Sequence, residues 1–93
     1  MVTIRKTWKL LFSKRAMQDA KKIRSSNLKS KAEEILDLLE KDPLVNQPPF
    51  KKLIGDFDGY YSRRINIQHR VVYSINNKDR EVYVLSMWTH YHD

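Results

Sequence analysis

The most informative part of this sequence is YYSRRINIQHRVVY, which occupies residues 60–73. Two segments rich in β-branched and aromatic residues flank a short polar break, a pattern typical of a β-hairpin. Three arginines, Arg63, Arg64 and Arg70, fall inside the predicted strands rather than at their ends. A buried arginine is costly and an exposed strand surface rarely carries three, so we expect one face of this hairpin to bind an anion.

Length and composition indicate one folded domain over residues 1–93. The chain is 41% hydrophobic with only two glycines, which is typical of a folded protein with one modest core. It has no cysteine, so a disulfide framework and a thiolate nucleophile are excluded. Its three histidines do not form a convincing metal-binding set, and we expect neither a metal nor a cofactor.

The charge balance points to an anionic partner. Eighteen Lys and Arg residues against eleven Asp and Glu residues leave a formal charge of +7. On so small a domain this favours a polyanion, most commonly nucleic acid. An acidic partner protein, or a charge that only maintains solubility, remains an alternative. No signal-peptide pattern or membrane-spanning segment is visible, so we expect a cytoplasmic protein without a membrane partner.

The N-terminal half predicts a strand and two helices. Residues 8–12 form the predicted strand, and Ser13 is well placed to cap the helix that follows. Apolar residues recur at helical spacing in the first helix at Ala16, Met17, Ala20 and Ile23. They recur in the second at Leu28, Ala32, Ile35 and Leu39. Asp42-Pro43 ends the second helix, because a residue before proline avoids the helical region. The helices should form an antiparallel hairpin.

The C-terminal half predicts strands at residues 60–66, 70–75 and 81–88, after a proline-containing loop at residues 43–50. A polar turn at residues 76–79 joins the last two strands. The predicted order is β-α-α-β-β-β. This is an α+β fold in which a two-helix hairpin packs on one face of an antiparallel sheet.

Strand alternation divides the side chains between two faces. The predicted core face carries Tyr61, Ile65, Ile67, Val71, Tyr73, Ile75, Tyr83, Leu85 and Met87. The opposite face carries Ser62, Arg64, Arg70, Val72, Ser74, Val84, Ser86, Trp88 and His90. Arg63 falls on the apolar side, so we expect it at a sheet edge, where an ion pair could satisfy it. A β-bulge would break this alternation.

Arg64, Arg70 and His90 together suit phosphate chemistry. Arginine forks onto phosphate oxygens and stabilises the charge that grows in a transition state, and histidine can protonate a leaving oxygen near neutral pH. Without metal or cysteine, this set suits RNA cleavage by the neighbouring 2′-hydroxyl. A phosphate-binding sheet with a structural histidine explains the same residues equally well.

A family resemblance adds to this interpretation. YSRRI at 61–65, HRVVY at 69–73 and THY at 89–91 resemble the Txe/YoeB toxins of the RelE/ParE superfamily, and PFKKL at 49–53 with Gly55 and Gly59 fits the same pattern. The resemblance spans residues 43–91 and implies a RelE-like fold. It also implies a ribosome-dependent mRNA interferase that acts on mRNA on the ribosome and is neutralised by a YefM/Axe-type antitoxin. A homodimer is compatible with it.

The resemblance also assigns roles at the site. It implies that Arg70 binds the scissile phosphate and that His90 is the acid, with Tyr91 beside it. At the position where the family commonly has a glutamate base, this chain has Lys51. Crowding by neighbouring cations would depress the pKa of Lys51 and let it act as the base. Asp56 or Asp58 could substitute, or the toxin could be weakened.

The remaining candidates contact RNA rather than perform chemistry. The predicted phosphate-binding residues are Arg64, Lys52 and Arg63. Because Arg63 falls on the apolar face of the sheet, a structural role is favoured for it. Trp88 is predicted to stack on a base, and partial cover for the sheet is the alternative. Two other functions remain open, namely a non-catalytic ParE-like gyrase inhibitor on the same scaffold and a plain RNA-binding module.

Overall fold

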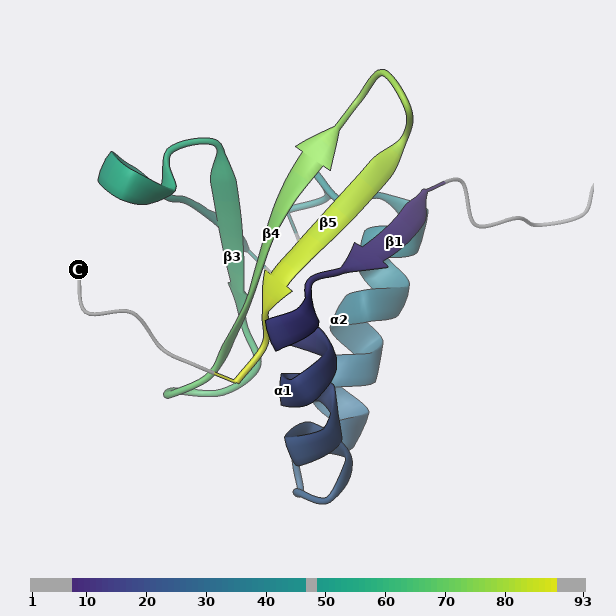
Figure 1. Cartoon of the computed structure of the whole chain (residues 1–93), viewed down its shortest axis with the longest axis vertical. Helices are drawn as coiled ribbons and strands as arrows, with labels where there is room; N and C mark the ends of the chain where they lie inside the picture. Colours follow the sequence, from purple (N-terminus) through teal and green to yellow (C-terminus); the bar gives the residue numbers. More distant parts are fainter. Residues whose placement is uncertain (1–7, 47–48, 89–93) are drawn as a thin grey trace, which may run out of the picture.

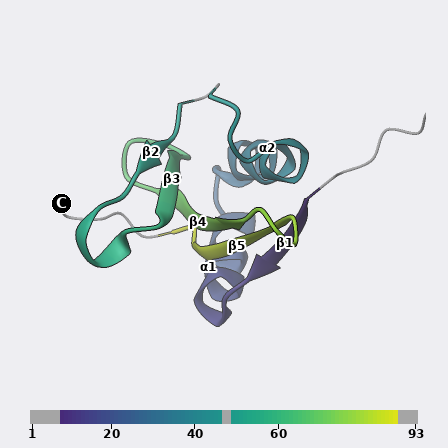
Figure 2. The ribbon, with the colours of Figure 1, turned by 90° about the horizontal axis from the view of Figure 1, so that it is seen from above.

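The computed structural model describes residues 8–46 and 49–88, which form one mixed sheet and two helices. The sheet order is β1-β5-β4-β3-β2. In chain order the elements are β1 (Lys9–Phe12), α1 (Lys14–Arg24), α2 (Lys29–Lys41), β2 (Lys51–Lys52), the 3₁₀ helix η1 (Gly55–Phe57), β3 (Tyr60–Arg64), β4 (Arg70–Asn76) and β5 (Glu81–Ser86). β1 lies at one end of the sheet and β2 at the other (Figures 1 and 2).

The predicted α+β fold with a helical hairpin is confirmed, and two features of the sheet differ from the prediction. β1 pairs parallel with β5, from Lys9 opposite Glu81 to Phe12 opposite Val84, so the sheet is mixed rather than antiparallel. A fifth strand, β2, pairs antiparallel with β3. The partner of β1 is distant in sequence, and β2 has only two residues, so a local alternation pattern reveals neither pairing.

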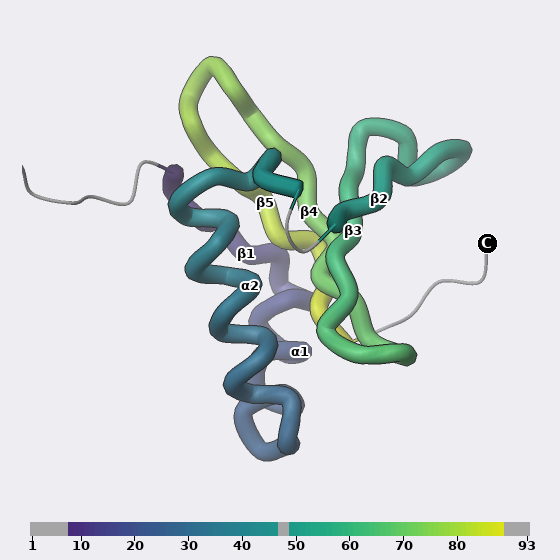
Figure 3. The backbone as a smooth tube through the Cα atoms, turned by 180° about the vertical axis from the view of Figure 1, so that it is seen from behind, coloured from purple at the N-terminus to yellow at the C-terminus, as the bar shows by residue number. Residues whose placement is uncertain are grey.

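α1 begins and α2 ends where the sequence predicts, whereas α2 begins after Leu28, whose side chain makes no capping hydrogen bond. The Ser13 hydroxyl accepts a hydrogen bond from the Ala16 N–H at 2.9 Å, which satisfies one free donor at the start of α1. Asp42 caps the end of α2 with its N–H bonded to the Leu38 carbonyl. α1 and α2 run in opposite directions (Figure 3). Neither is long and apolar enough to cross a membrane, and no other described helix is.

The helices and the sheet share one core. Its buried members are Ala16, Ile23, Ala32, Ile35, Leu39, Ile65, Val71, Tyr73, Val82, Val84 and Met87. Met17, predicted in the apolar stripe of α1, is 59% exposed, and Ile67 is 84% exposed because β3 ends at Arg64 and Ile67 lies in the turn. The other predicted stripe positions of both helices are buried in the core or packed against it.

A β-bulge corrects the predicted faces of β5. Val72 pairs with Ser86 but Tyr73 pairs with Val84, so Leu85 is an extra residue in β5. Before the bulge, Val82 and Val84 enter the core in place of the predicted Tyr83 and Leu85. After it, Met87 is again on the core side as predicted. The bulge therefore reverses the alternation over the first half of β5 and restores it for the residues that lead out of the strand.

Candidate phosphate-binding site

Arg64 and Arg70 lie directly opposite each other. They form the last pair of the β3–β4 hairpin and therefore project from the same face of the sheet. Like charges at directly opposed positions destabilise a sheet. A local conflict of this kind is typical of a functional site, where a bound ion of the other sign relieves it.

A third strand completes a pocket around this pair. β2 places Lys51 opposite Ser62, which lies two residues before Arg64 and therefore on the same face. The pocket has a volume of about 380 Å³ and is lined by Pro49, Phe50, Lys51, Ser62, Arg64 and Arg70. Three cationic side chains from three adjacent strands thus surround one hollow. The sequence predicted Lys51, Arg64 and Arg70 for the site, and the fold brings these three together.

Arg70 has an unused hydrogen-bond donor in this pocket. Its Nε is buried and has no hydrogen-bond partner among the described residues. Nearly all buried polar groups in proteins are paired, so an orphaned donor on a charged side chain calls for a ligand. A phosphate oxygen is the acceptor that a guanidinium fits best, because it accepts a charge-assisted bond from a planar fork.

Arg63 is not available to an external phosphate, which corrects its assignment as a phosphate-binding residue. Its side chain is 1% exposed. Nε donates to the Tyr73 hydroxyl at 2.9 Å, and one terminal nitrogen donates to the carbonyl oxygens of Pro43 and Val45. β3 lies between β2 and β4, so the predicted sheet-edge position is also wrong. The guanidinium instead ties the loop after α2 to the sheet.

The Tyr73 hydroxyl is part of this internal network. It donates to the Pro43 carbonyl at 3.3 Å while it accepts from Arg63. Burial raises the pKa of the Tyr73 hydroxyl above its ordinary value, and the nearby Arg63 guanidinium opposes that rise. The phenol therefore stays neutral and keeps its proton for the Pro43 carbonyl. The guanidinium carbon of Arg63 also lies 5.0 Å from the centre of the Phe50 ring, so the network supports one wall of the pocket.

Lys52 lies on the other face of the sheet. It pairs with Tyr61, whose ring stacks on the core residue Tyr73 with centroids 5.7 Å apart. Because neighbouring strand residues point to opposite faces, Lys52 is directed away from the pocket that contains Lys51. Lys52 does not line the pocket, and its assignment as a phosphate-binding residue stays a prediction. Asp56 and Asp58, the alternative bases, lie at η1 and do not line the pocket either.

Trp88 is packed against the turn that precedes Arg70. Its ring stacks on the His69 imidazole with centroids 4.2 Å apart, and its carbonyl accepts a hydrogen bond from His69 Nδ1. The predicted acid His90 and its neighbour Tyr91 lie outside the described residues. The chain segment that leads to them nevertheless passes His69, the residue next to Arg70 in sequence.

Three lining residues, Pro49, Phe50 and Ser62, were absent from the sequence prediction of the site. Ser62 is 2% exposed and lines the pocket between Lys51 and the arginines. Phe50 packs edge-on against Tyr61 at 5.4 Å and forms a wall. Alternation had placed Ser62 on this face, but only the pairing of β2 with β3 reveals that it lies beside Lys51. Within the described residues, no group of three or more His, Asp or Glu side chains could hold a metal ion.

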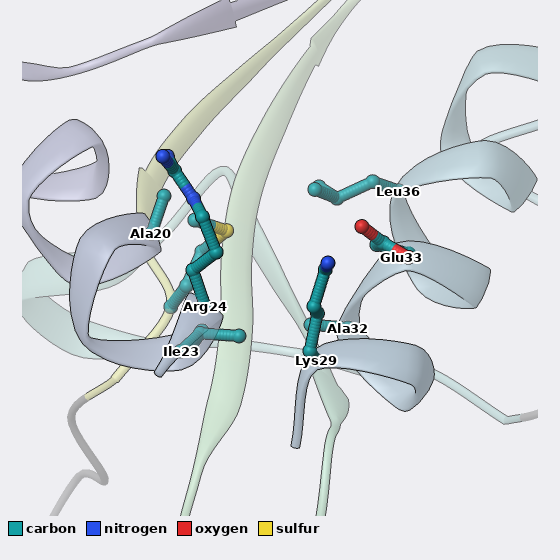
Figure 4. Close-up of a pocket in the computed structure, with 8 residues that line it drawn as sticks. Ala20, Ile23, Arg24, Lys29, Ala32, Glu33 and Leu36 are labelled. Carbon is teal, nitrogen blue, oxygen red and sulfur yellow. The ribbon is translucent and has the colours of Figure 1, made fainter. Parts of the chain in front are cut away.

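A second, smaller hollow lies between the two helices, away from the predicted site residues. Its volume is about 170 Å³. Ala20 and Ile23 of α1, Ala32 and Leu36 of α2, and Met87 give it an apolar lining. Figure 4 shows Arg24 on the α1 side and Lys29 with Glu33 on the α2 side. Its apolar surface continues the core.

Comparison with known proteins supplies the family. The family model for the YoeB-like toxin of bacterial type II toxin-antitoxin systems matches residues 12–91. A curated relative, Toxin YoeB from Synechocystis sp. (strain ATCC 27184 / PCC 6803 / Kazusa), is 36% identical over 73 residues, which are 78% of this chain and 76% of the relative.

Solved structures share the fold over nearly their whole length. A YoeB/ParE toxin from Agrobacterium tumefaciens has a TM-score of 0.81 at 25% identity and covers 89% of this chain and 99% of its own. A YoeB-YefM complex from Staphylococcus aureus has a TM-score of 0.76 at 31% identity, covering 90% and 98%. A YoeB dimer from the same species has a TM-score of 0.75 at 29% identity, covering 91% and 99%.

The matched segment includes both helices, all strands after Phe12 and the whole phosphate-binding pocket. It also extends over the His90-Tyr91 pair, so the sequence motifs and the pocket fall within one family match. The chain belongs to the YoeB-like toxins of bacterial type II toxin-antitoxin systems and has the RelE-like fold of that superfamily.

Proposed function

We propose that this toxin is a ribosome-dependent mRNA endoribonuclease that blocks translation by cleaving mRNA on the ribosome. The observation that carries the proposal is the buried, unpartnered Arg70 Nε in a pocket with two further cations, Arg64 and Lys51. Such a pocket is built to hold a phosphate and to stabilise additional negative charge on it.

The reaction uses the 2′-hydroxyl of the RNA as its nucleophile and requires no metal. The base removes the 2′ proton, O2′ forms a bond to phosphorus, and the bond from phosphorus to the 5′-oxygen breaks. The products are a 2′,3′-cyclic phosphate and a free 5′-hydroxyl. Arg70 and Arg64 hold the non-bridging oxygens, and His90 donates a proton to the departing 5′-oxygen.

We assign Lys51 as the base that removes the proton of the 2′-hydroxyl. It is the cation of β2 that faces Ser62 and shares the pocket with both arginines. Tyr91 is assigned beside the acid by its position next to His90 in sequence. One face of the Trp88 ring stacks on His69. We keep the proposal that Trp88 also stacks on an RNA nucleobase.

Primer extension on mRNA after toxin induction tests the proposal directly. Wild-type toxin should produce cuts in phase with codons, and Arg70→Ala and His90→Ala should abolish the cuts and the growth arrest while the proteins remain folded. Lys78→Ala, which removes an exposed cation in the β4–β5 turn, is the control and should cleave normally. Growth arrest without cuts would instead indicate a non-catalytic toxin such as a gyrase inhibitor, or an RNA-binding module.

Lys51→Glu tests the least conventional assignment. Glutamate restores the residue type common in the family but places a negative charge beside the phosphate. If Lys51 is the working base or a phosphate clamp, cleavage falls. An increase in cleavage would show that lysine is a weakened version of the family site and would remove Lys51 from the mechanism.

The cellular setting follows from the same proposal. A toxin that cuts mRNA on the ribosome acts in the cytoplasm, and a YefM/Axe-type antitoxin is its natural inhibitor. The charge of +7 suits an acidic, partly disordered segment as the inhibitory element. A homodimer is the proposed state of the free toxin, and light scattering during size-exclusion chromatography decides it.

A further inference from the structure

A buried serine lines the phosphate-binding pocket. Ser62 belongs to β3 and is 2% exposed, and its side chain projects from the same face of the strand as Arg64. Lys51 of β2 lies directly opposite it on one side, and Val72 of β4 lies opposite it on the other. Ser62 is therefore fixed by a paired strand on each side, and it lies beside the lysine and the arginine pair of the pocket.

Ser62 differs chemically from the other side chains of this pocket. Among the described residues that line the pocket, it carries the only side-chain oxygen. A charged lysine and an arginine donate hydrogen bonds and accept none, whereas a serine hydroxyl does both. The side chains of Pro49 and Phe50 contain no polar atom. Ser62 is thus the lining side chain that can accept a hydrogen bond from a ligand while the cations hold its phosphate.

The ligand of the proposed function carries a donor at the corresponding place. In RNA the 2′-hydroxyl lies on the ribose carbon next to the one that bears the phosphate, so a phosphate held by Arg64 and Arg70 brings this hydroxyl with it. A volume of about 380 Å³ is in the range of pockets that hold small organic ligands, so the ribose has room as well. A hydroxyl taken from water needs a hydrogen-bond partner, because burial without one is costly.

We propose that Ser62 is a specificity-determining residue whose hydroxyl accepts a hydrogen bond from the 2′-hydroxyl of the nucleotide before the scissile phosphate. This contact distinguishes RNA from DNA, since a deoxyribose has no donor to offer. The inference rests on the proposed function, because it takes the phosphate in the pocket to be that of RNA. Lys51 is the cross-strand neighbour of Ser62, so the serine holds the attacking hydroxyl beside the residue assigned as its base.

The test compares ligands that differ in a single 2′ group. Programmed ribosomes carry an mRNA in which a methylene group replaces the 5′-oxygen at the cleavage position, so that the bond from phosphorus to carbon resists cleavage. The nucleotide before it carries a 2′-hydroxyl, a 2′-hydrogen or a 2′-fluorine. Fluorescence anisotropy of labelled toxin gives its dissociation constant for each ribosome. Because each variant meets the same three ribosomes, a difference between variants in the ratio of these constants belongs to the toxin.

Wild type should bind the hydroxyl ligand about 3- to 10-fold more tightly than the other two, which is the net effect of one neutral hydrogen bond. Ser62→Ala should bind all three with similar affinity. Ser62→Cys has a similar size but a weak acceptor, so it should lose most of the discrimination and decides the question if Ser62→Ala does not fold. Ser74→Ala removes a half-buried hydroxyl of β4 outside the pocket, and this matched control should discriminate as wild type does.

Three results would overturn the role of Ser62. The first is a folded Ser62→Ala, checked by circular dichroism, that discriminates as wild type does. The second is a fluorine ligand that binds as tightly as the hydroxyl ligand, because the 2′ group would then be an acceptor rather than a donor. The third concerns Lys51→Met, which should weaken all three ligands and keep the discrimination. Loss of discrimination in that variant alone would assign the 2′-hydroxyl to the lysine.

Arg70→Ala separates this inference from the proposed function. It should weaken the binding of all three ligands by a similar factor, because it removes a phosphate contact and leaves Ser62 in place. If Arg70→Ala binds as wild type does, or if wild type binds none of the ribosomes, the phosphate site and the proposed function fail. If wild type distinguishes the 2′ groups but leaves no cuts in mRNA, recognition by Ser62 stands and the proposed cleavage is wrong.

Discussion

Two adjacent arginines in β3 lie in different environments, because strand side chains alternate between the two faces of the sheet. Arg63 points into the core and is satisfied by Tyr73 and two backbone carbonyls, whereas Arg64 points to the other face and pairs with Arg70. The same guanidinium group is thus a structural cross-link at one position and, at the next, part of the pocket for which we propose phosphate binding. Residue type alone does not distinguish them, but the face of the strand does.

Substitution of each arginine by methionine should separate stability from activity. Arg63→Met leaves buried carbonyl and hydroxyl groups without their donor, and each unsatisfied group costs about 1–3 kcal/mol, so the free energy of unfolding should fall by roughly 3 kcal/mol or more. Arg64→Met removes an exposed cation and should change the free energy of unfolding by no more than about 0.5 kcal/mol. It should strongly reduce mRNA cleavage. Urea denaturation and primer extension provide the two measurements. Equal stability losses in both variants would contradict this division.

Tyr73 should make the stability of the protein depend on pH at alkaline values. Its folded-state pKa lies above the ordinary value of about 10, so the fold favours the neutral phenol. The stability from this shift is fully present below pH of about 10 and is lost as pH rises through the folded-state pKa. The difference in free energy of unfolding between wild type and Tyr73→Phe should therefore shrink above pH of about 10. A constant difference from neutral to alkaline pH would exclude this contribution.

At the scale of elements, local signals were reliable and long-range pairing was not. The hairpin of β3 and β4, the Ser13 cap and the end of α2 at Asp42 follow from neighbouring residues, and the structure confirms them. The parallel pairing of β1 depends on a partner distant in sequence, and β2, although its partner is near, has only two residues and therefore shows no alternation. The Leu85 bulge reversed the expected faces over part of β5.

The site was predictable to the extent that it lies on one hairpin. Alternation placed Arg64 and Arg70 together without any knowledge of the sheet, because both belong to adjacent, locally paired strands. Lys51 of β2 lies opposite Ser62, and this register places it on the same face as the two arginines. Arg63 was misplaced as a ligand, because only its burial and its internal hydrogen bonds show that it is not available to a phosphate.

Ser13 links two elements and offers a test of that coupling. Its hydroxyl accepts from Ala16 N–H and also donates to the Leu85 carbonyl at 2.6 Å, which joins the start of α1 to the bulge in β5. Ser13→Ala should lower the free energy of unfolding by about 1–2 kcal/mol, since it removes both a helix cap and a long-range bond. Ser30→Ala, at an exposed position of α2, should have little effect. Thermal and urea denaturation measure both.

At the scale of the whole molecule, Lys51, Arg64 and Arg70 lie together in one pocket, and the helices share the core with the strands. The net charge of +7 attracts any nucleic acid, but the pocket of Lys51, Arg64 and Arg70 is where we propose that a phosphate is held. The helices contribute to the site indirectly. They cover the opposite face of the sheet, and α1 reaches the end of β5 through Asp19.

Salt dependence should distinguish the pocket from the general charge. Binding of a 2′-O-methylated, uncleavable RNA should weaken with added salt, and each lost phosphate contact on a single strand should reduce the slope of log K against log salt by about 0.7. Arg64→Met should show that reduction and Lys78→Met should not. Fluorescence anisotropy over a range of potassium chloride concentrations provides the slopes. Identical slopes for the two variants would show that binding is spread over the surface.

The parallel pairing of β1 with β5 has a consequence for how the toxin is made. β1 is the first strand in the chain, yet its partner is the last strand described, and Ser13 and Leu85 are 72 positions apart. Closing so long a loop is slow, and contacts of this kind delay folding more than they affect stability. During synthesis, β1 has no partner until residues 81–86 have emerged. The sheet is therefore completed late, and a newly translated toxin passes through a stage in which its first strand is exposed.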